Sequence, residues 1–163
     1  MTATIRLRPI VKEDLDLLFR IYASTREEEM AQVPWSNSDK DKFLRMQFQL
    51  QTDHYEKHYP QARFEIILLD EEPAGRLYVD RRDKEIRIVD IALLPSFRGQ
   101  GIGSSLLHEL IEESDNTGKP VSIHVEQYNP AKRLYERLGF RPIGEVGVYD
   151  LMERPVAPKV SDA

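Results

Sequence analysis

The segment Arg98–Gly103, with the sequence RGQGIG, contains residue types that suit the binding of a phosphate group. It follows an apolar stretch and begins a run with helical spacing, which places its amides at a helix N-terminus. Backbone N–H groups there are unsatisfied and carry partial positive charge, and glycines let a large anion approach them closely. A tight strand-to-helix turn needs the same glycines for its geometry alone, so both interpretations stay open.

Two nucleotide-binding motifs can be compared with this segment. A Walker A loop requires Gly-Lys followed by Ser or Thr, and the sequence contains no such tripeptide. The dinucleotide fingerprint G-x-G-x-x-G would use Gly99 and Gly101, but its third glycine position is Ser104. Glu126 follows roughly twenty residues later, near a strand end, where a ribose-binding acid is expected. A nicotinamide-dependent oxidoreductase therefore remains a remote alternative.

A second segment, Asn129–Phe140 (NPAKRLYERLGF), places a tyrosine among residues that favour a helix. Asparagine at the N-cap, proline at the first position and glycine after the end predict a helix that Asn129–Pro130 opens and Gly139 closes. Tyr135 shares this helix with apolar residues at core spacing, so a buried structural role is the alternative to a chemical one.

The apolar periodicity places both segments late in a series of strands and helices. Strands are expected at 4–9, 64–69, 74–81, 86–94 and 121–125, with one or two more in 140–152. Helices are expected at 11–24, at about 101–116 and after a cap at Ser36 or Ser38, the last with Phe43, Met46 and Leu50 on its buried stripe. Strand 86–94 is the most apolar and is expected at the centre of its sheet.

Residues 91–103 (IALLPSFRGQGIG) and 129–140 resemble the two signature segments of the GNAT superfamily of N-acetyltransferases. The first matches the family's R/Q-x-x-G-x-G/A motif through Arg98, Gly101 and Gly103. The second matches through Asn129, Tyr135, Gly139 and Phe140. The order of elements along 4–152 is also similar to the family's fold.

The resemblance implies an α/β (α+β) fold, with a mixed, mostly antiparallel sheet of six to seven strands flanked by about four helices. It implies one acetyltransferase domain over 1–153 and a C-terminal tail over 154–163. Acetyl-CoA is the expected co-substrate, and no metal is expected. Its pantetheine arm would fill a gap between the splayed strands 86–94 and 121–125, and its pyrophosphate would lie on the amides of 98–104.

The residues expected at this coenzyme are Ile91, Ala92, Leu93, Leu94, Arg98, Gly99, Gln100, Gly101, Ile102, Gly103, Ser104, Asn129 and Lys132. Asn129 either contacts the pantetheine amides or only caps its helix. Lys132 either reaches the 3′-phosphate or is an ordinary exposed helix charge.

The implied reaction is direct attack of a neutral amine on the thioester. A backbone N–H near Leu93 would polarise the carbonyl. Tyr135 matches the family's general acid, since a phenol with a pKa of about 10 can protonate the leaving thiolate. The general base is open: Glu126 is preferred, then Asp90, then His124, each with a structural or substrate-orienting role as the alternative. Asp90 interrupts an apolar strand, where a charge needs a partner.

The acceptor is the part of the reaction on which the sequence is least informative. Glu28, in the acidic run 27–29, could border an opening for a cationic amine that Trp35 and Tyr128 line. A solvated helix end is the alternative for the acidic run. The expected acceptor is a primary amine of a small molecule or a peptide. A non-catalytic acyl-CoA-binding or sensor module of the same fold is the alternative function.

Composition narrows the class of protein. The chain has 163 residues, a net charge of −5 and no cysteine, so a cysteine nucleophile and thiolate metal sites are excluded. An acidic chain argues against extended nucleic-acid partners, and no apolar run approaches the ~18 residues of a membrane span. No signal peptide is recognised at the N-terminus, and a cytoplasmic location is expected. Exposed strand edges near the end of the chain make a homodimer plausible.

Overall fold

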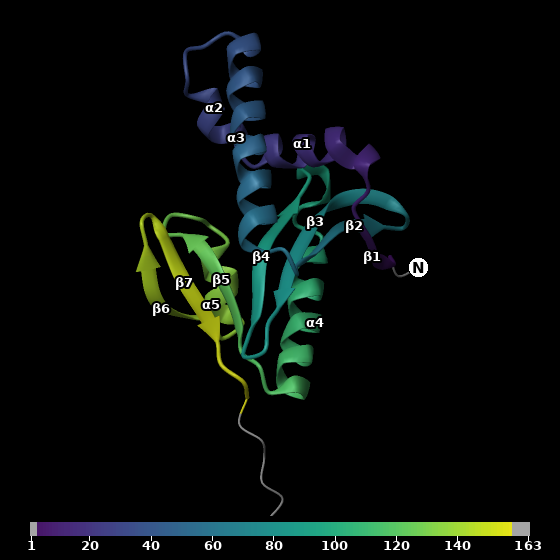
Figure 1. Ribbon diagram of the computed structural model, residues 1–163, viewed down its shortest axis with the longest axis vertical. Coiled ribbons are helices and arrows are strands. Elements are labelled where there is room, and N and C mark those ends of the chain that lie inside the picture. The colour runs from purple at the N-terminus through teal and green to yellow at the C-terminus, as the bar shows by residue number, and fades with distance from the viewer. Residues whose placement is uncertain (1–2, 158–163) are drawn as a thin grey trace, which may run out of the picture. The chain divides into compact units, whose positions relative to one another are not determined.

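The computed structural model describes residues 3–157 of the chain (Figure 1). The strands are β1 (Ile5–Pro9), β2 (Arg63–Leu69), β3 (Glu72–Arg81), β4 (Ile86–Leu93), β5 (Val121–Glu126), β6 (Arg141–Val146) and β7 (Tyr149–Arg154). The α-helices are α1 (Leu15–Ser24), α2 (Glu27–Ala31), α3 (Asn37–His58), α4 (Ile102–Thr117) and α5 (Lys132–Arg137). Short 3-10 helices, η1 (Lys12–Asp14) and η2 (Pro95–Phe97), precede α1 and follow β4. Residues 158–163 of the expected tail lie outside the described residues.

The strands form one seven-stranded sheet in the order β1-β2-β3-β4-β5-β7-β6. The predicted central place of β4 is confirmed, and so is the mixed, mostly antiparallel sheet, because β4 and β5 pair in parallel while β1–β2, β5–β7 and β6–β7 are antiparallel. Asp70 and Glu71 join β2 to β3 with φ angles of 49° and 69°. Two consecutive residues with positive φ are typical of a tight hairpin turn.

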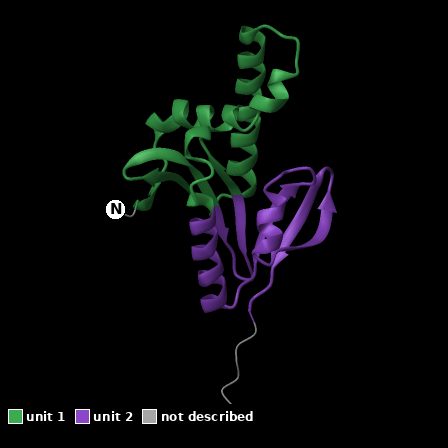
Figure 2. Ribbon diagram, turned by 180° about the vertical axis from the view of Figure 1, so that it is seen from behind, with its two compact units in different colours: residues 1–78, 90–103 green, residues 79–89, 104–163 purple. Residues whose placement is uncertain are grey.

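The chain divides into two compact units (Figure 2). The first unit comprises residues up to Tyr78 together with Asp90–Gly103, and it contains β1, β2 and helices α1 to α3. In its core, the Phe48 ring from α3 lies 5.7 Å from the Phe19 ring and 5.8 Å from the Tyr22 ring of α1. Aromatic pairs at this spacing stabilise a core beyond their buried area.

The buried stripe that the sequence predicts for α3 is wrong. Met46 and Leu50 are 52% and 57% exposed, and Phe48 is the residue of α3 that is buried. The helix carries two alternative apolar stripes, and α1 contacts the one that contains Phe48. The predicted cap is confirmed at Ser36, whose hydroxyl accepts a hydrogen bond from the Asp39 amide at 3.1 Å.

The second unit comprises Val79–Val89 and the chain from Ser104 onward. In its core, β5 is buried at Val121, Ser122, Ile123 and Val125, and Met152 of β7 is fully buried beside it. Leu106, Leu107 and Leu110 form the buried stripe of α4. The α4 helix ends near Gly118, and the Ser114 hydroxyl donates to the Lys119 carbonyl just beyond it.

Candidate active site

The glycine segment forms an open turn that leads into α4. Gly99 and Gly101 have φ angles of +74° and +80°, a conformation that residues with a side chain rarely adopt. A Cβ atom built on either glycine would meet no other atom within 4 Å. The glycines therefore serve the backbone conformation, and the space beside them is open. The first amides of α4 also have no intrahelical acceptor, as at every helix start.

The strand before this turn exposes backbone groups along one edge. The Leu94 amide donates to the Ala74 carbonyl at 2.8 Å, so the backbone groups of Leu94 face β3. Because neighbouring residues of a strand point their backbone groups in opposite directions, those of Ile91 and Leu93 face away from β3. The ladder between β4 and β5 covers Ile86–Ile88 and Val121–Ile123 in the described part of the chain, although both strands continue further.

Gly75 lies opposite this part of β4, and the sequence analysis missed it. A Cβ atom at Gly75 would lie 2.1 Å from the Ala92 carbonyl oxygen and 2.9 Å from the Leu93 Cα atom. The glycine therefore permits a close approach of β3 to the segment 91–94. An isolated glycine within a strand pattern is a signal for such an approach.

Arg98 points its side chain back into its own unit. Its Nε donates to the Leu93 carbonyl at 3.0 Å, and a terminal nitrogen lies 3.3 Å from the Ser24 hydroxyl at the end of α1. These contacts tie the turn to the end of β4 and to α1. The Arg98 guanidinium thus positions the turn, while the backbone of Arg98 remains part of the open glycine segment.

Asp90 has the partner that its place in an apolar strand requires. Its Oδ2 atom accepts hydrogen bonds from Arg76 at 2.5 Å and from the Tyr55 hydroxyl at 3.2 Å. The same Arg76 nitrogen also donates to Gln51 on α3 at 2.7 Å. The Arg76 side chain is only 3% exposed, so this ion pair is largely shielded from water. Sequence reasoning predicted the need for a partner but could not identify Arg76.

Tyr135 is buried in α5, where its ring lies 5.5 Å from the Phe140 ring in an edge-to-face arrangement. The Phe140 amide donates to the Tyr135 carbonyl at 3.0 Å. Gly139, with a φ of +95°, makes the turn that returns Phe140 onto the helix. The Asn129 side chain accepts from the Ala131 amide at 2.9 Å within the turn that precedes the helix. The N-cap is Ala131 and the helix begins at Lys132, so the predicted N-cap at Asn129 and first position at Pro130 are wrong.

Lys132 contacts an acidic residue of β7. Its ammonium lies 2.5 Å from Asp150, whose side chain is 8% exposed. The hydrogen bond from Lys132 holds the pKa of Asp150 below its usual value, and the same bond raises the pKa of Lys132. Neither shift is visible in the sequence, because the two residues are distant along the chain.

The candidate bases near the end of β5, His124 and Glu126, lie on either side of the buried Val125. Glu126 is half-buried, and its carbonyl accepts from the Asn129 amide at 2.9 Å. His124 is largely exposed. Desolvation of the covered part of its ring and, second, the positive charge of Arg87 lower its pKa. A lower pKa keeps the imidazole neutral at pH 7.

The residues expected at the acceptor lie on the surface of their units. Glu28 is exposed on the short helix α2. Trp35 is 46% exposed, with its ring 5.5 Å from the Phe43 ring. Tyr128, in the other unit, is 92% exposed. Within 3–157, no cluster of three or more metal-ligating side chains occurs, and no helix there is long and apolar enough to span a membrane.

Comparisons with known proteins agree with these features. The sequence model of the acetyltransferase (GNAT) family matches residues 20–140. A Bacillus subtilis (strain 168) protein provisionally named as a [ribosomal protein bS18]-alanine N-acetyltransferase is 29% identical over 135 residues, which cover 81% of this chain and 78% of the relative. A Haemophilus influenzae [ribosomal protein bS18]-alanine N-acetyltransferase is 35% identical over 60 residues, or 36% of this chain and 41% of the relative.

Solved structures share the fold. The crystal structure of the PaiA N-acetyltransferase from Thermoplasma acidophilum in complex with coenzyme A superimposes with a TM-score of 0.68 at 18% identity, covering 93% of this chain and 99% of that one. The ribosomal-protein-S18-alanine N-acetyltransferase from Escherichia coli has a TM-score of 0.63 at 20% identity, covering 98% and 99%.

Proposed function

Because this chain belongs to the acetyltransferase (GNAT) family and is an acetyl-transferring enzyme, we propose that it moves the acetyl group of acetyl-CoA to a primary amine at a peptide N-terminus. The observation that carries this proposal is the arrangement at the end of β4. Backbone groups of Ile91 and Leu93 face away from β3, and the open glycine turn follows immediately. The coenzyme has pantetheine amides that need hydrogen-bond partners and a pyrophosphate that a helix N-terminus can bind.

The donor would lie along this edge and over the turn. The pantetheine amides would pair with the backbone of Ile91 and with the Leu93 carbonyl, as an additional strand pairs with a sheet edge. The pyrophosphate would accept from amides of residues 99–103, where Gly99 and Gly101 leave the approach open. Arg98 supports the site through the Leu93 carbonyl and Ser24, so its role is to position the turn.

The chemical step forms a C–N bond and breaks the C–S bond of the thioester. The Leu93 amide would stabilise the negative charge that develops on the carbonyl oxygen. The amine loses a proton to a base, and the departing thiolate takes a proton from Tyr135. Glu126, at the end of β5, is the preferred base. The Asp90 carboxylate accepts from Arg76 and Tyr55. We assign Asp90 a positioning role through its ion pair.

The names of two relatives support this acceptor class, because both describe N-acetylation of an alanine of a ribosomal protein. An N-terminal amine has a pKa near 8, below that of a lysine side chain, and therefore deprotonates more readily before attack. Glu28 and Trp35 offer an acidic and an aromatic group in the segment where an acceptor would be selected.

A thiol-release assay tests the proposal directly. Purified protein with acetyl-CoA is given a short peptide beginning with alanine, the same peptide with its N-terminus blocked, and a set of small primary amines. We expect coenzyme A release with the free peptide and none with the blocked one. Release with small amines alone would refute the peptide acceptor.

A binding measurement separates the enzyme from a sensor module and from an oxidoreductase. A ligand at about 100 times its Kd stabilises a protein by about 2.7 kcal/mol. We expect acetyl-CoA to raise the melting temperature and NAD to leave it unchanged. Stabilisation by acetyl-CoA without release of coenzyme A, with any peptide or amine, would favour the sensor.

A further inference from the structure

The end of α3 carries two histidines that no step of the proposed acetyl transfer uses. His54 and His58 are four residues apart on the helix, so their side chains are neighbours on one face. Their ring centres lie 4.3 Å apart, with 44° between the ring planes. Both residues are exposed. Two histidines at this spacing on a helix can bind one metal ion together.

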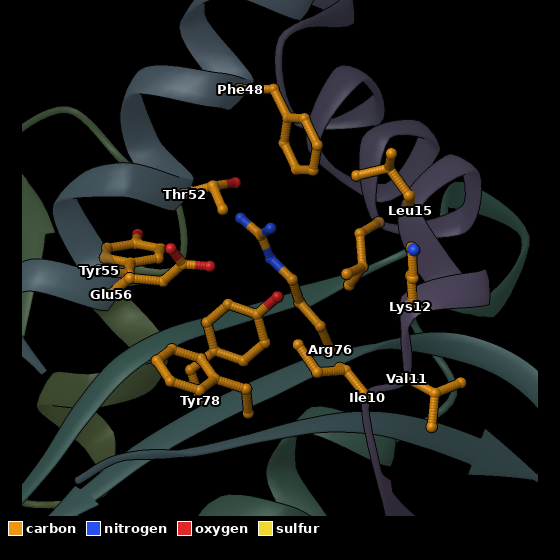
Figure 3. Close-up of a pocket in the computed structure, with 12 residues that line it drawn as sticks. Ile10, Val11, Lys12, Leu15, Phe48, Thr52, Tyr55, Glu56, Arg76 and Tyr78 are labelled. Carbon is orange, nitrogen blue, oxygen red and sulfur yellow. The ribbon is translucent and has the colours of Figure 1, made fainter. Parts of the chain in front are cut away.

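The face of α3 that carries the histidines differs from the face that packs inside the first unit. Thr52, Tyr55 and Glu56 of the same turns line a pocket of about 350 Å³, and Figure 3 shows them around it. His54 and His58 are not among the lining residues of that pocket. A metal ion would therefore reach the two histidines from solvent, without a change in how α3 packs in its unit.

The distance between the two rings fits one particular coordination geometry. A metal–nitrogen bond of about 2.0 Å puts the centre of an imidazole ring about 3.2 Å from the ion. Two rings bound at 90° then have centres about 4.5 Å apart, and two rings bound at the tetrahedral angle have centres about 5.2 Å apart. The distance of 4.3 Å between His54 and His58 is close to the first value. The spacing thus favours adjacent positions of a tetragonal ion.

The His54 ring is bordered by two tyrosine rings. The centre of the Tyr55 ring lies 6.1 Å from it, and the centre of the Tyr59 ring lies 6.5 Å from it at an interplanar angle of 73°. Tyr55 is itself held by its hydrogen bond to Asp90. Neighbouring rings restrict the conformations of a side chain, and a restricted side chain loses less entropy when it binds a ligand.

The position of the pair on the helix favours a cation. His58 is the last residue of α3, where the unpaired carbonyls carry the negative end of the helix dipole. Between the two histidines and directly before them lie the carboxylates of Asp53 and Glu56 and the ammonium of Lys57, which sum to a charge of −1. A divalent cation bound there would meet no net repulsion from its neighbours.

The donor atoms decide which ions fit the pair. Imidazole nitrogens suit Cu²⁺, Ni²⁺ and Zn²⁺, whereas Mg²⁺ and Ca²⁺ take oxygen ligands. The 90° arrangement is typical of Cu²⁺ and Ni²⁺, since Zn²⁺ sites are usually tetrahedral. In the described part of the chain no group of three or more metal-ligating side chains occurs, so the pair would supply two ligands and leave the other positions open.

We propose that His54 and His58 form a two-nitrogen chelate site for a divalent transition-metal ion with tetragonal coordination, Cu²⁺ or Ni²⁺. Each histidine gives one ring nitrogen to the ion, and water fills the remaining positions. The site is additional to acetyl transfer, because neither residue belongs to the segment 91–94, the glycine turn or α5. An ion there links successive turns at the end of α3, the part of the helix from which Tyr55 donates to Asp90.

Metal titrations of the full chain test the ligand class. Cu²⁺, Ni²⁺, Zn²⁺ and Mg²⁺ are compared near neutral pH by competition with a chelator of known affinity. We expect Cu²⁺ to bind at least tenfold more tightly than Zn²⁺, Ni²⁺ to bind at least as tightly as Zn²⁺, and Mg²⁺ not to bind. The electron paramagnetic resonance spectrum with one equivalent of Cu²⁺ should show coupling to two imidazole rings. Tighter binding of Zn²⁺ than of Ni²⁺, or coupling to a single ring, would overturn the proposal.

Matched variants locate the ion. The chain has four histidines, and His108 is an exposed one on α4 that has no histidine four residues away. We expect His54→Gln and His58→Gln each to weaken Cu²⁺ binding at least tenfold, because a second ligand held within reach adds affinity through its effective concentration. His108→Gln should leave the Kd unchanged. Equal affinity in His54→Gln and His108→Gln would refute the chelate.

The four-residue spacing is tested with the number of histidines kept constant. The double change of Asp53→His with His54→Gln moves one histidine by a single residue, to a position about 140° around the helix from His58. We expect this variant to bind Cu²⁺ as weakly as His54→Gln does. Affinity equal to that of the unchanged chain would overturn the proposal. Thiol release is assayed separately, so failure of the metal site leaves the proposed acetyl transfer untouched.

Discussion

The substitution Gly75→Ala should impair acetyl transfer, although Gly75 is not expected to touch a substrate. Its added Cβ would lie 2.1 Å from the Ala92 carbonyl oxygen and 3.0 Å from the Ala92 carbonyl carbon. Both are backbone atoms, so no flexible side chain can move aside. The close approach can be relieved only if β3 and the segment 91–94 separate.

The size of that displacement follows from the contact distance. Ordinary van der Waals contact begins at 3.4 Å, so the strands must separate by about 1 Å. A misplacement of about 1 Å at a binding site can cost about 100-fold in rate. Overpacking of a well-packed region costs about 1–3 kcal/mol of folding free energy. We therefore expect kcat/KM for acetyl-CoA to fall on the order of 100-fold, in a protein that still folds.

Gly144→Ala is the matched control. Gly144 also lies within a strand, but its added Cβ would meet no atom within 4 Å, and its φ is not in the left-handed region. Both variants should be assayed for thiol release across acetyl-CoA concentrations and for unfolding in urea. If Gly75→Ala keeps the kcat/KM of Gly144→Ala, then the position of the segment 91–94 does not govern donor binding.

Three further outcomes are expected. Tyr135→Phe should lower kcat by about 100-fold or more, as for loss of a general acid, in thiol-release assays from pH 6 to 10; unchanged turnover across that range would remove Tyr135 as the acid. Arg8 holds the pKa of Asp14 below its usual 3.8. The stability from this ion pair is therefore full above pH 3.8 and is lost as the pH falls through the lower pKa of the folded state. In urea unfolding, Asp14→Asn should be less stable than wild type at pH 7, and this difference in unfolding free energy should shrink below about pH 3.8. Lys132→Ala removes the partner of Asp150 and should lower the melting temperature, while the KM ratio of acetyl-CoA to its 3′-dephospho form stays unchanged; a changed ratio would place Lys132 at the 3′-phosphate.

Features with strict local geometry were predictable from the sequence. The glycine turn needs positive φ at Gly99 and Gly101, and few residues other than glycine supply it. Gly139 ends the α5 segment for a similar reason, because its φ is also positive. Such positions restrict the residue type so strongly that the motif carries the backbone conformation with it.

Features that depend on distant parts of the chain were not predictable. Arg76 reads in the sequence as one more charged residue of a strand, and only the fold brings it to Asp90 and Gln51. The prediction of the buried face of α3 was wrong because two faces of this helix are similarly apolar. One contains Phe48 and the other contains Met46 and Leu50. Which stripe is buried depends on where α1 crosses the helix, and helical periodicity does not contain that information.

The ion pair of Asp90 and Arg76 explains why a charge is present in the central strand of this sheet. Side chains and backbone groups of a strand point in perpendicular directions, so β4 can direct the Asp90 carboxylate to Arg76 while its next residues present backbone groups at the strand edge. If β4 shifted by one residue relative to β3, the ion pair would break, and different backbone groups of β4 would face away from β3. The charge thus favours the register of the segment 91–94, to which we assign donor binding. An apolar residue at position 90 would pack as well but would leave Arg76 buried without its counter-ion, a change that costs more than it gains.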